Sequence, residues 1–330
     1  KEFKNMKKKQ LLGIIAAVLI FSVVGVVGIS SAHRQNSLQN ELLSRVTDAG
    51  FSSMPNSENI AVIPIYGTIG ATETDIFGGY SGGYNHELVI NTIDEAIDSA
   101  YNQGLFIDID SGGGTVYHSD EVYLKLMEYK EKTGRPIYAY SNSMMASGAY
   151  YIACAADKIY SNRNATVGSI GVYISVSDYS ALYSKLGIKN DLIRSGENKA
   201  MGSSYYPMTA DQRGIYQGVV DECYNQFLDI VISARGYDRS TALSIADGRI
   251  YTASQGLSNN LIDKVCSYDE ALNEFRELCA TDSVYYPSVS VSTLSKLFEK
   301  AESFVPKSEY EQAAEFVAGL ESGVPMYYAG

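Results

Sequence analysis

The stretch LFIDIDSGGGTVYHSDEVYLKLMEYKEKTGRPIYAYSN, residues 105–142, decides the fold class. It begins with the short apolar run LFIDID, which is typical of a buried strand, and passes through the glycine turn SGGG into apolar residues at helical spacing. It ends in a second apolar run, PIYAYSN, that again predicts a strand. Strand, helix and strand in this order predict two parallel strands joined by a crossover helix.

The same alternation continues on both sides of this stretch. Upstream, NIAVIPIYGTIG (59–70) predicts a buried strand, which a glycine-rich loop and a helix over 86–104 follow. Downstream, the pattern predicts helices over 141–157 and 178–187, and strands over 158–162, 165–176 and 190–196. Beyond Lys199 the chain reads as mostly helical, with its longest amphipathic run at Met208–Gly236. We therefore predict an α/β architecture with parallel strands.

The N-terminal segment predicts a membrane anchor. Residues 1–10 hold five lysines against one glutamate, and residues 11–29 follow without a charge. This length fits a transmembrane helix, and the lysines place the N-terminus in the cytoplasm. A cleaved signal peptide ending at Ser30-Ser31-Ala32 is the alternative, although the apolar region of such peptides is usually only about 7 to 15 residues. We expect a single-pass protein of the cell membrane with most of its chain extracytoplasmic.

These patterns divide the chain into segments. We predict a cytoplasmic basic segment at 1–10, a transmembrane signal anchor at 11–29, a linker at 30–58, a main domain at 59–275, and a C-terminal helical segment and tail at 276–330. The net charge of −12 argues against a nucleic acid as partner.

The four cysteines lack the paired short spacing of a zinc site, and we expect neither a metal nor a cofactor. Cys154 and Cys223 lie in helix-like runs and are expected as buried thiols, whereas a disulfide between Cys266 and Cys279 is left open.

Ser147, in SNSMMASGAYYIACAAD (141–157), is the candidate nucleophile. It follows a predicted strand and opens a predicted helix, where unpaired N–H groups and the helix dipole favour a developing negative charge. The N–H of Gly148 would then point at the oxyanion. A plain N-cap is the competing interpretation, because serine is very common at that position.

A second strand-to-helix turn, Asp110 to Thr115, offers further N–H groups on a backbone that a carbonyl can approach closely. Two such turns at the ends of adjacent parallel strands converge on one site. That arrangement can form an oxyanion hole, in which removing one donor typically costs about 10²- to 10³-fold in rate.

A nucleophilic serine needs a general base that accepts its proton. Only three histidines are present: His33 lies next to the predicted span, and a Ser-His-Asp triad would have to use His86 or His118. A lysine is the alternative, but it can accept a proton at neutral pH only where its pKa falls by roughly 3 units. Lys199, in RSGENKAMGSS, has fewer charged neighbours than the lysines of the amphipathic helices.

Five motifs together resemble a known family. They are SGGGTV, MMASGAYYIACAAD, NATVGSIGV, SGENKAMGSSYYPMT and IADGRIYTASQGLSNNLID. In this order and spacing, over about Asn59 to Val265, the chain resembles the signal peptide peptidase A (SppA) family of membrane-bound serine peptidases, in its short, single-copy form.

The resemblance implies a Clp protease/crotonase-like fold of repeated strand-strand-helix units and a Ser-Lys dyad. The family's nucleophile corresponds to Ser147, its general base to Lys199, and the serine that orients the lysine to Ser169. The family's oxyanion-hole amides correspond to Gly113 or Gly114 and to Gly148. Members form ring-like homo-oligomers at the outer membrane face and cut remnant signal peptides, which are apolar with small residues near the cut.

Two departures accompany the resemblance. The family usually has Asn-Ser-Pro-Gly-Gly where this chain has DSGGG (110–114), which predicts a looser turn. The family's arginine between Ser-Pro-Phe and Pro-Met-Thr is also missing from SSYYPMT (203–209). Other interpretations are a crotonase-type acyl-CoA enzyme, a related peptidase that works with stomatin-like partners, and an inactive membrane-tethered scaffold.

Overall fold

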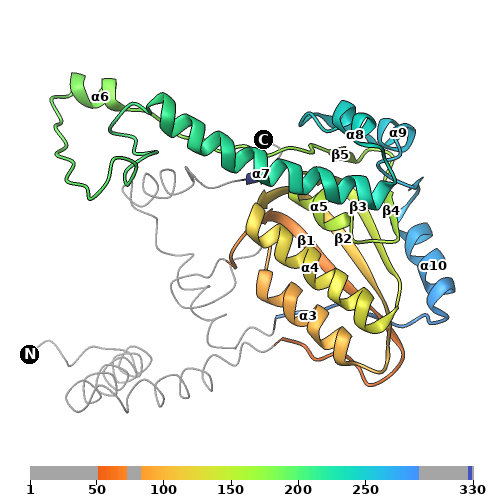
Figure 1. Cartoon of the computed structure of the whole chain (residues 1–330). Helices are drawn as coiled ribbons and strands as arrows, with labels where there is room; N and C mark the ends of the chain where they lie inside the picture. Colours follow the sequence, from red (N-terminus) through yellow and green to blue (C-terminus); the bar gives the residue numbers. More distant parts are fainter. Residues whose placement is uncertain (1–50, 73–82, 290–325, 329–330) are drawn as a thin grey trace, which may run out of the picture.

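The computed structural model describes residues 51–72, 83–289 and 326–328, and a single sheet forms the centre of that part (Figure 1). Its strands are β1 (Asn59–Ile69), β2 (Asn102–Thr115), β3 (Ile137–Ala146), β4 (Lys158–Ser161), β5 (Thr166–Gly168), β6 (Ile250–Thr252), β7 (Lys264–Val265), β8 (Val284–Tyr285) and β9 (Met326–Tyr328). The main order is β6-β5-β3-β2-β1-β8, and β4 pairs with both β3 and β7. The strands are parallel except that β6 on β5 and β9 on β2 are antiparallel, so the sheet is mixed and the α/β prediction is confirmed.

Helices cover both faces of this sheet (Figure 1). They are α3 (His86–Asp98), α4 (Val116–Thr133), α5 (Gly148–Ala153), α6 (Ser180–Lys185), α7 (Ala210–Arg235), α8 (Arg239–Ile245), α9 (Ala253–Ser258) and α10 (Tyr268–Cys279). One hydrophobic cluster lies between the sheet and α3, α4, α5 and the second half of α7. The other lies between the opposite face and α10.

The alternation of side chains along the strands explains these two layers. In β1, Ala61 and Ile63 face the first cluster, while Ile60 and Val62 face the second. Successive side chains of a strand point to opposite faces, so a continuous apolar run is what a strand covered on both faces requires. Helix ends follow local signals as well: Thr209 and Gln212 form a capping box at the start of α7.

Four expected elements differ from the structure. The strand expected over 165–176 extends only over β5, Thr166–Gly168. The SGGG segment is the end of β2 rather than a loose turn, and the helix expected over 141–157 is a strand as far as Ala146 and a helix only from Gly148 to Ala153. The segment 141–146 remains extended because it pairs with β2 and β5. The strand expected over 190–196 is wrong: that segment is exposed and pairs with no described strand.

Residues 171–209, here called the projecting segment, extend away from the sheet. No residue between 171 and 211 is buried, and Figure 1 shows α6 at the end of α7 that is remote from the strands. α7 changes character along its length, since its buried apolar residues Phe227, Leu228 and Val231 all lie in its second half. The first half of α7 therefore leaves the core together with the projecting segment.

Several expectations fall outside the described residues. The predicted span at 11–29, His33 and the predicted C-terminal helix all lie there. Within 51–72, 83–289 and 326–328, no helix has the length and apolar character needed to cross a membrane. The four cysteines are free thiols, so Cys266 and Cys279 are not joined; Cys154 is buried, as expected, while Cys223 is only partly buried.

Candidate active site

Ser147 occupies a strained position between β3 and α5. Its φ of 55° and ψ of −121° are unusual for a residue with a side chain, and such a conformation costs on the order of 1–3 kcal/mol. The residue is 1% exposed, and among the described residues its hydroxyl has no hydrogen-bond partner. Its side chain does not cap α5, although the serine stands at the N-cap position. The helix-cap interpretation therefore does not account for this serine.

Ser169 lies next to Ser147 because β5 is a neighbour of β3. Ala146 is paired with Gly168, and the N–H of Ser147 donates to the carbonyl of Gly168 at 2.7 Å. Ser169 follows directly, with a φ of 50° and 8% exposure, and its own N–H donates to the carbonyl of Arg249 at 2.8 Å. Two buried serines with positive φ thus stand at the ends of adjacent parallel strands.

The SGGG segment at the end of β2, residues 111–114 and here called the glycine turn, lies beside this pair, since Ser111 is paired with Met145. Gly113 has a φ of 101°, which only glycine adopts without strain. Its N–H donates to Ser111 Oγ at 3.1 Å, and the Ser111 hydroxyl donates to the carbonyl of Gly67 at 2.6 Å. This serine therefore holds the turn in place of the missing proline, a role that the sequence analysis did not assign to it.

Position 114 must be a glycine because the backbone of β1 packs directly against it. A Cβ at this position would lie 1.8 Å from the carbonyl oxygen of Ile69, so Gly114→Ala forces the backbones of β1 and β2 apart. We expect a loss of about 3 kcal/mol or more in the free energy of unfolding, measured by thermal unfolding followed by circular dichroism. Gly70→Ala is the matched control, because a Cβ at Gly70 meets nothing within 4 Å. Equal unfolding temperatures for the two variants would contradict this packing.

The backbone of β9 pairs with the glycine turn. Tyr328, Tyr327 and Met326 stand opposite Gly113, Gly114 and Thr115 in antiparallel register. This strand takes the side of β2 that β3 occupies up to Met145. The turn next to Ser147 can therefore accept an extended peptide as an additional strand.

Lys199 is not part of this buried group. It lies in the projecting segment, where it is exposed, and its N–H donates to the carbonyl of Gly196 at 3.1 Å. Within the described residues its ammonium group forms no ion pair. The structure thus brings together Ser147, Ser169 and the glycine turn, while Lys199 as general base stays a prediction.

The two described histidines form a separate cluster with Glu121. His86 Nε2 lies 2.8 Å from Glu121 Oε2, and the rings of His86 and His118 are 4.7 Å apart. His118 Nδ1 is 2.6 Å from Thr115 Oγ1. Burial raises the pKa of Glu121, but hydrogen bonds from His86 and Tyr117 outweigh it and hold this pKa below its usual value. Because the Ser147 hydroxyl has no described partner, neither histidine completes a Ser-His-Asp triad here.

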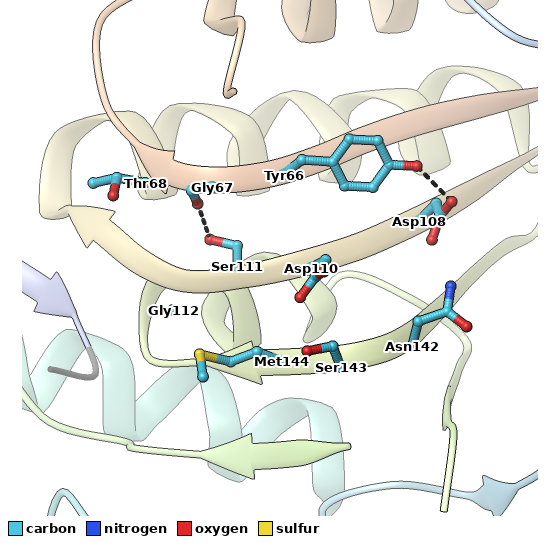
Figure 2. A pocket seen from close by; sticks show the side chains of 10 residues that line it. All are labelled: Tyr66, Gly67, Thr68, Asp108, Asp110, Ser111, Gly112, Asn142, Ser143 and Met144. Atoms are coloured by element: carbon cyan, nitrogen blue, oxygen red, sulfur yellow. Dashed lines mark hydrogen bonds between the residues drawn. The ribbon is translucent and has the colours of Figure 1, made fainter. Parts of the chain in front are cut away.

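A pocket of about 690 Å³ opens beside the glycine turn, on the face of the sheet that α10 covers further along (Figure 2). Its lining comes from the ends of three strands: Tyr66, Gly67 and Thr68; Asp108, Asp110, Ser111 and Gly112; and Asn142, Ser143 and Met144. The Tyr66 hydroxyl donates to Asp108 at 2.6 Å. The spacing of the two aspartates in LFIDID puts both on one face of β2, a signal that the sequence analysis did not use.

The fold and the site define a class of protein. A strained, buried serine after a parallel strand, facing a glycine turn that can bind an extended peptide, is the arrangement of a serine hydrolase with an α/β fold. Residues 129–282 match the model of peptidase family S49. "Putative signal peptide peptidase SppA" of Enterococcus faecium is 27% identical over 83% of this chain and 81% of its own length.

Two further relatives agree with this class. A "Putative protease" of Synechocystis sp. is 30% identical over 60% of this chain and 70% of its own length. "Protease 4" of Haemophilus influenzae is 28% identical over 68% of this chain but only 35% of its own length. The chain belongs to peptidase family S49 and is a serine peptidase, which confirms the resemblance to the SppA family.

Proposed function

We propose that this chain is a membrane-anchored serine endopeptidase that degrades remnant signal peptides and other small hydrophobic peptides outside the cytoplasmic membrane. One observation carries the catalytic part: the strained, buried Ser147, whose hydroxyl lacks a described partner, stands beside Ser169 and the glycine turn. The anchor is inferred from the apolar run at 11–29 behind a lysine-rich end. The relative's printed name, signal peptide peptidase, supports the substrate class. The α/β sheet is compatible with a Clp protease/crotonase-like fold.

The proposed mechanism assigns one role to each group. Ser147 attacks the substrate carbonyl while neutral Lys199 takes its proton, and the protonated lysine then passes a proton to the leaving amine. Water, activated by the same lysine, releases the acyl group. Ser169 orients the lysine, and the N–H groups of Gly148 and of Gly113 or Gly114 stabilise the oxyanion. In the free protein the Gly113 N–H is already donated to Ser111 Oγ, so an oxyanion at Gly113 would compete with that bond.

The exposed position of Lys199 supports a site completed by a second copy of the chain. The projecting segment presents large apolar side chains to solvent, with Ile193 97%, Leu186 64% and Leu182 52% exposed. Apolar patches of this kind mark surfaces that a partner covers. We propose that neighbouring copies, arranged head to tail in a ring, each place Lys199 beside the Ser147 and Ser169 of the next copy.

Mixing two inactive variants tests this arrangement. Ser147→Ala lacks the nucleophile and Lys199→Ala lacks the base, and each alone is expected to be inactive on an internally quenched apolar peptide. When equal amounts are dissociated and reassembled together, we expect about one quarter of the wild-type activity. Each site between two copies has a one-in-two chance of an intact Ser147 and an independent one-in-two chance of an intact Lys199.

The control for this experiment is the double variant Ser147→Ala/Lys199→Ala, reassembled with wild-type protein at the same ratio. It dilutes wild-type neighbours in the same way but supplies neither group. If the two single variants stay inactive in mixed assemblies of proven composition, the dyad forms within one chain and the proposed exchange is wrong.

A further inference from the structure

The pocket beside the glycine turn carries more negative charge than its surroundings balance. Asp108 is only 8% exposed, and the one hydrogen bond that its carboxylate accepts from a described side chain comes from the Tyr66 hydroxyl. Asp110 is exposed at the rim, two residues along the same strand. Neither aspartate belongs to an ion pair of the described residues, and no lysine, arginine or histidine lines the pocket.

The electrostatics of Asp108 also reflect this unbalanced negative charge. Burial raises the pKa of Asp108 above its usual value, the hydrogen bond from Tyr66 opposes that shift, and the charge of Asp110 adds to it. A cation placed between the two carboxylates would favour the charged form of both. Both aspartates lie on the middle strand of the pocket, and the strand of Asn142 and Met144 runs beside it (Figure 2).

The pairing of β9 independently directs a peptide toward this pocket. A peptide bound in that position runs antiparallel to β2. The peptide residue that follows the one opposite Gly113 therefore approaches Gly112. There it meets β3, which is paired with Ser111 through Met145. Met145, opposite Ser111, is fully buried, whereas Gly112 and Met144 line the open pocket. The peptide must turn out over Gly112 and Met144.

The N-to-C direction of a strand bound in the position of β9 determines which part of a substrate reaches the pocket. The carbonyl under attack lies at the glycine turn, and the residues that follow it in the peptide are the leaving group. We propose, resting on the proposed peptidase function, that this pocket is the subsite for the residue directly after the scissile bond and that Asp108 and Asp110 select a lysine or arginine at that position.

The chemistry and size of the pocket both suit a lysine or arginine side chain. A lysine or arginine has a long apolar stem that can lie along Met144, and a charged head that can reach the carboxylates below. An acidic residue at the same position would add a third negative charge. Among apolar peptides, the enzyme should therefore prefer those in which a basic residue follows the small residue at the cut.

Three internally quenched peptides test the subsite in the detergent-solubilised full chain. They are identical apolar sequences with alanine before the scissile bond and lysine, glutamine or glutamate after it, and mass spectrometry of the products identifies the bond that is cut. We expect kcat/KM to be about tenfold higher for the lysine than for the glutamine peptide, and lowest for glutamate.

The variants connect this preference to the two carboxylates. Asp108→Asn/Asp110→Asn should bring the lysine-to-glutamine ratio to within about twofold, and Asp110→Asn alone, at the exposed rim, should reduce it to about threefold. Since the ratio is taken within each variant, a general loss of activity cancels. Glu131→Gln, on exposed α4 surface without a described ion pair, removes one charge elsewhere and should keep the full ratio. A ratio near one in the wild type, or an unchanged ratio in the double variant, overturns the proposal.

A binding measurement separates this proposal from the function on which it rests. Leaving-group peptides that begin with lysine or glutamine are titrated into the Ser147→Ala variant by calorimetry, which needs no turnover. Tighter binding of the lysine peptide, lost in Ser147→Ala/Asp108→Asn/Asp110→Asn, supports the subsite even if no peptide is cut. Failure to cut any peptide contradicts the peptidase proposal, whereas equal affinities contradict the subsite.

Discussion

Replacing Ser147 by alanine is expected to lower kcat on an apolar quenched peptide by roughly 10⁴- to 10⁶-fold, the range seen when a serine peptidase loses its nucleophile. The reason is that the acyl-enzyme cannot form without the hydroxyl. Nothing else in the surroundings depends on that group, because among the described residues it makes no hydrogen bond. Loss of activity should therefore occur without loss of structure.

Stability measurements on the same position make this prediction sharper. Ser147→Ala removes a buried hydroxyl without a described partner, so the unfolding temperature should stay level or rise. Ser147→Gly also relieves the strain at φ 55°, and we expect a gain of about 1 kcal/mol, or roughly 2–4 °C in Tm. The control is Ser161→Ala, because Ser161 is also fully buried and its hydroxyl also has no described partner; this variant should keep both its activity and its unfolding temperature. An active Ser147→Ala enzyme, or a large drop in Tm for Ser147→Gly, would remove Ser147 from the proposed role.

A strained residue whose replacement raises the stability of the protein is typical of a functional position. At Ser147 the strain has a visible structural reason. β3 must end and α5 must begin within one residue, while the N–H of that residue still bonds to the Gly168 carbonyl at 2.7 Å. The same sharp corner keeps the hydroxyl away from the helix cap.

The strands of the central sheet could be predicted from sequence because their apolar runs are covered on both faces. β1 and the core of β2 are examples, and the long helix over Met208–Gly236 agrees with α7 to within two residues. The end of β3 was missed, since SNSMMA has no apolar periodicity and is extended only because β2 and β5 pair with it. Pairing with remote strands leaves no local signal.

The candidate site was predictable where its residues carry local sequence signals, and not where their positions depend on pairing with remote strands. Ser147 and the glycine turn carry local signals, and their convergence follows from the parallel order of β2 and β3. Ser169 was implied only by the resemblance, and its contact with the nucleophile depends on the pairing of β5 with β3. The role of Ser111 in holding the turn depends on a carbonyl 44 positions away, that of Gly67, which no spacing in the sequence indicates.

Lys199→Met is expected to lower kcat by roughly 10³- to 10⁵-fold, because the alkyl chain retains most of the packing but cannot accept the Ser147 proton. Lys189→Met is the matched control: it changes another exposed lysine of the projecting segment and should leave kcat within about twofold of the wild type. Both variants should assemble to the same size in light scattering.

A chemical rescue distinguishes a base from a structural lysine. Lys199→Ala leaves space for a small primary amine, and added ethylamine should restore part of the activity with a rate that rises with pH as the free amine becomes neutral. A lysine that only holds the projecting segment in place would show no such dependence on the amine. Because Lys199 is exposed in the single chain, rescue should also require the assembled form, so dilution below the assembly concentration should abolish both wild-type activity and rescue. Activity that survives in dissociated chains would contradict the shared site, because the serine and its base would then belong to one chain.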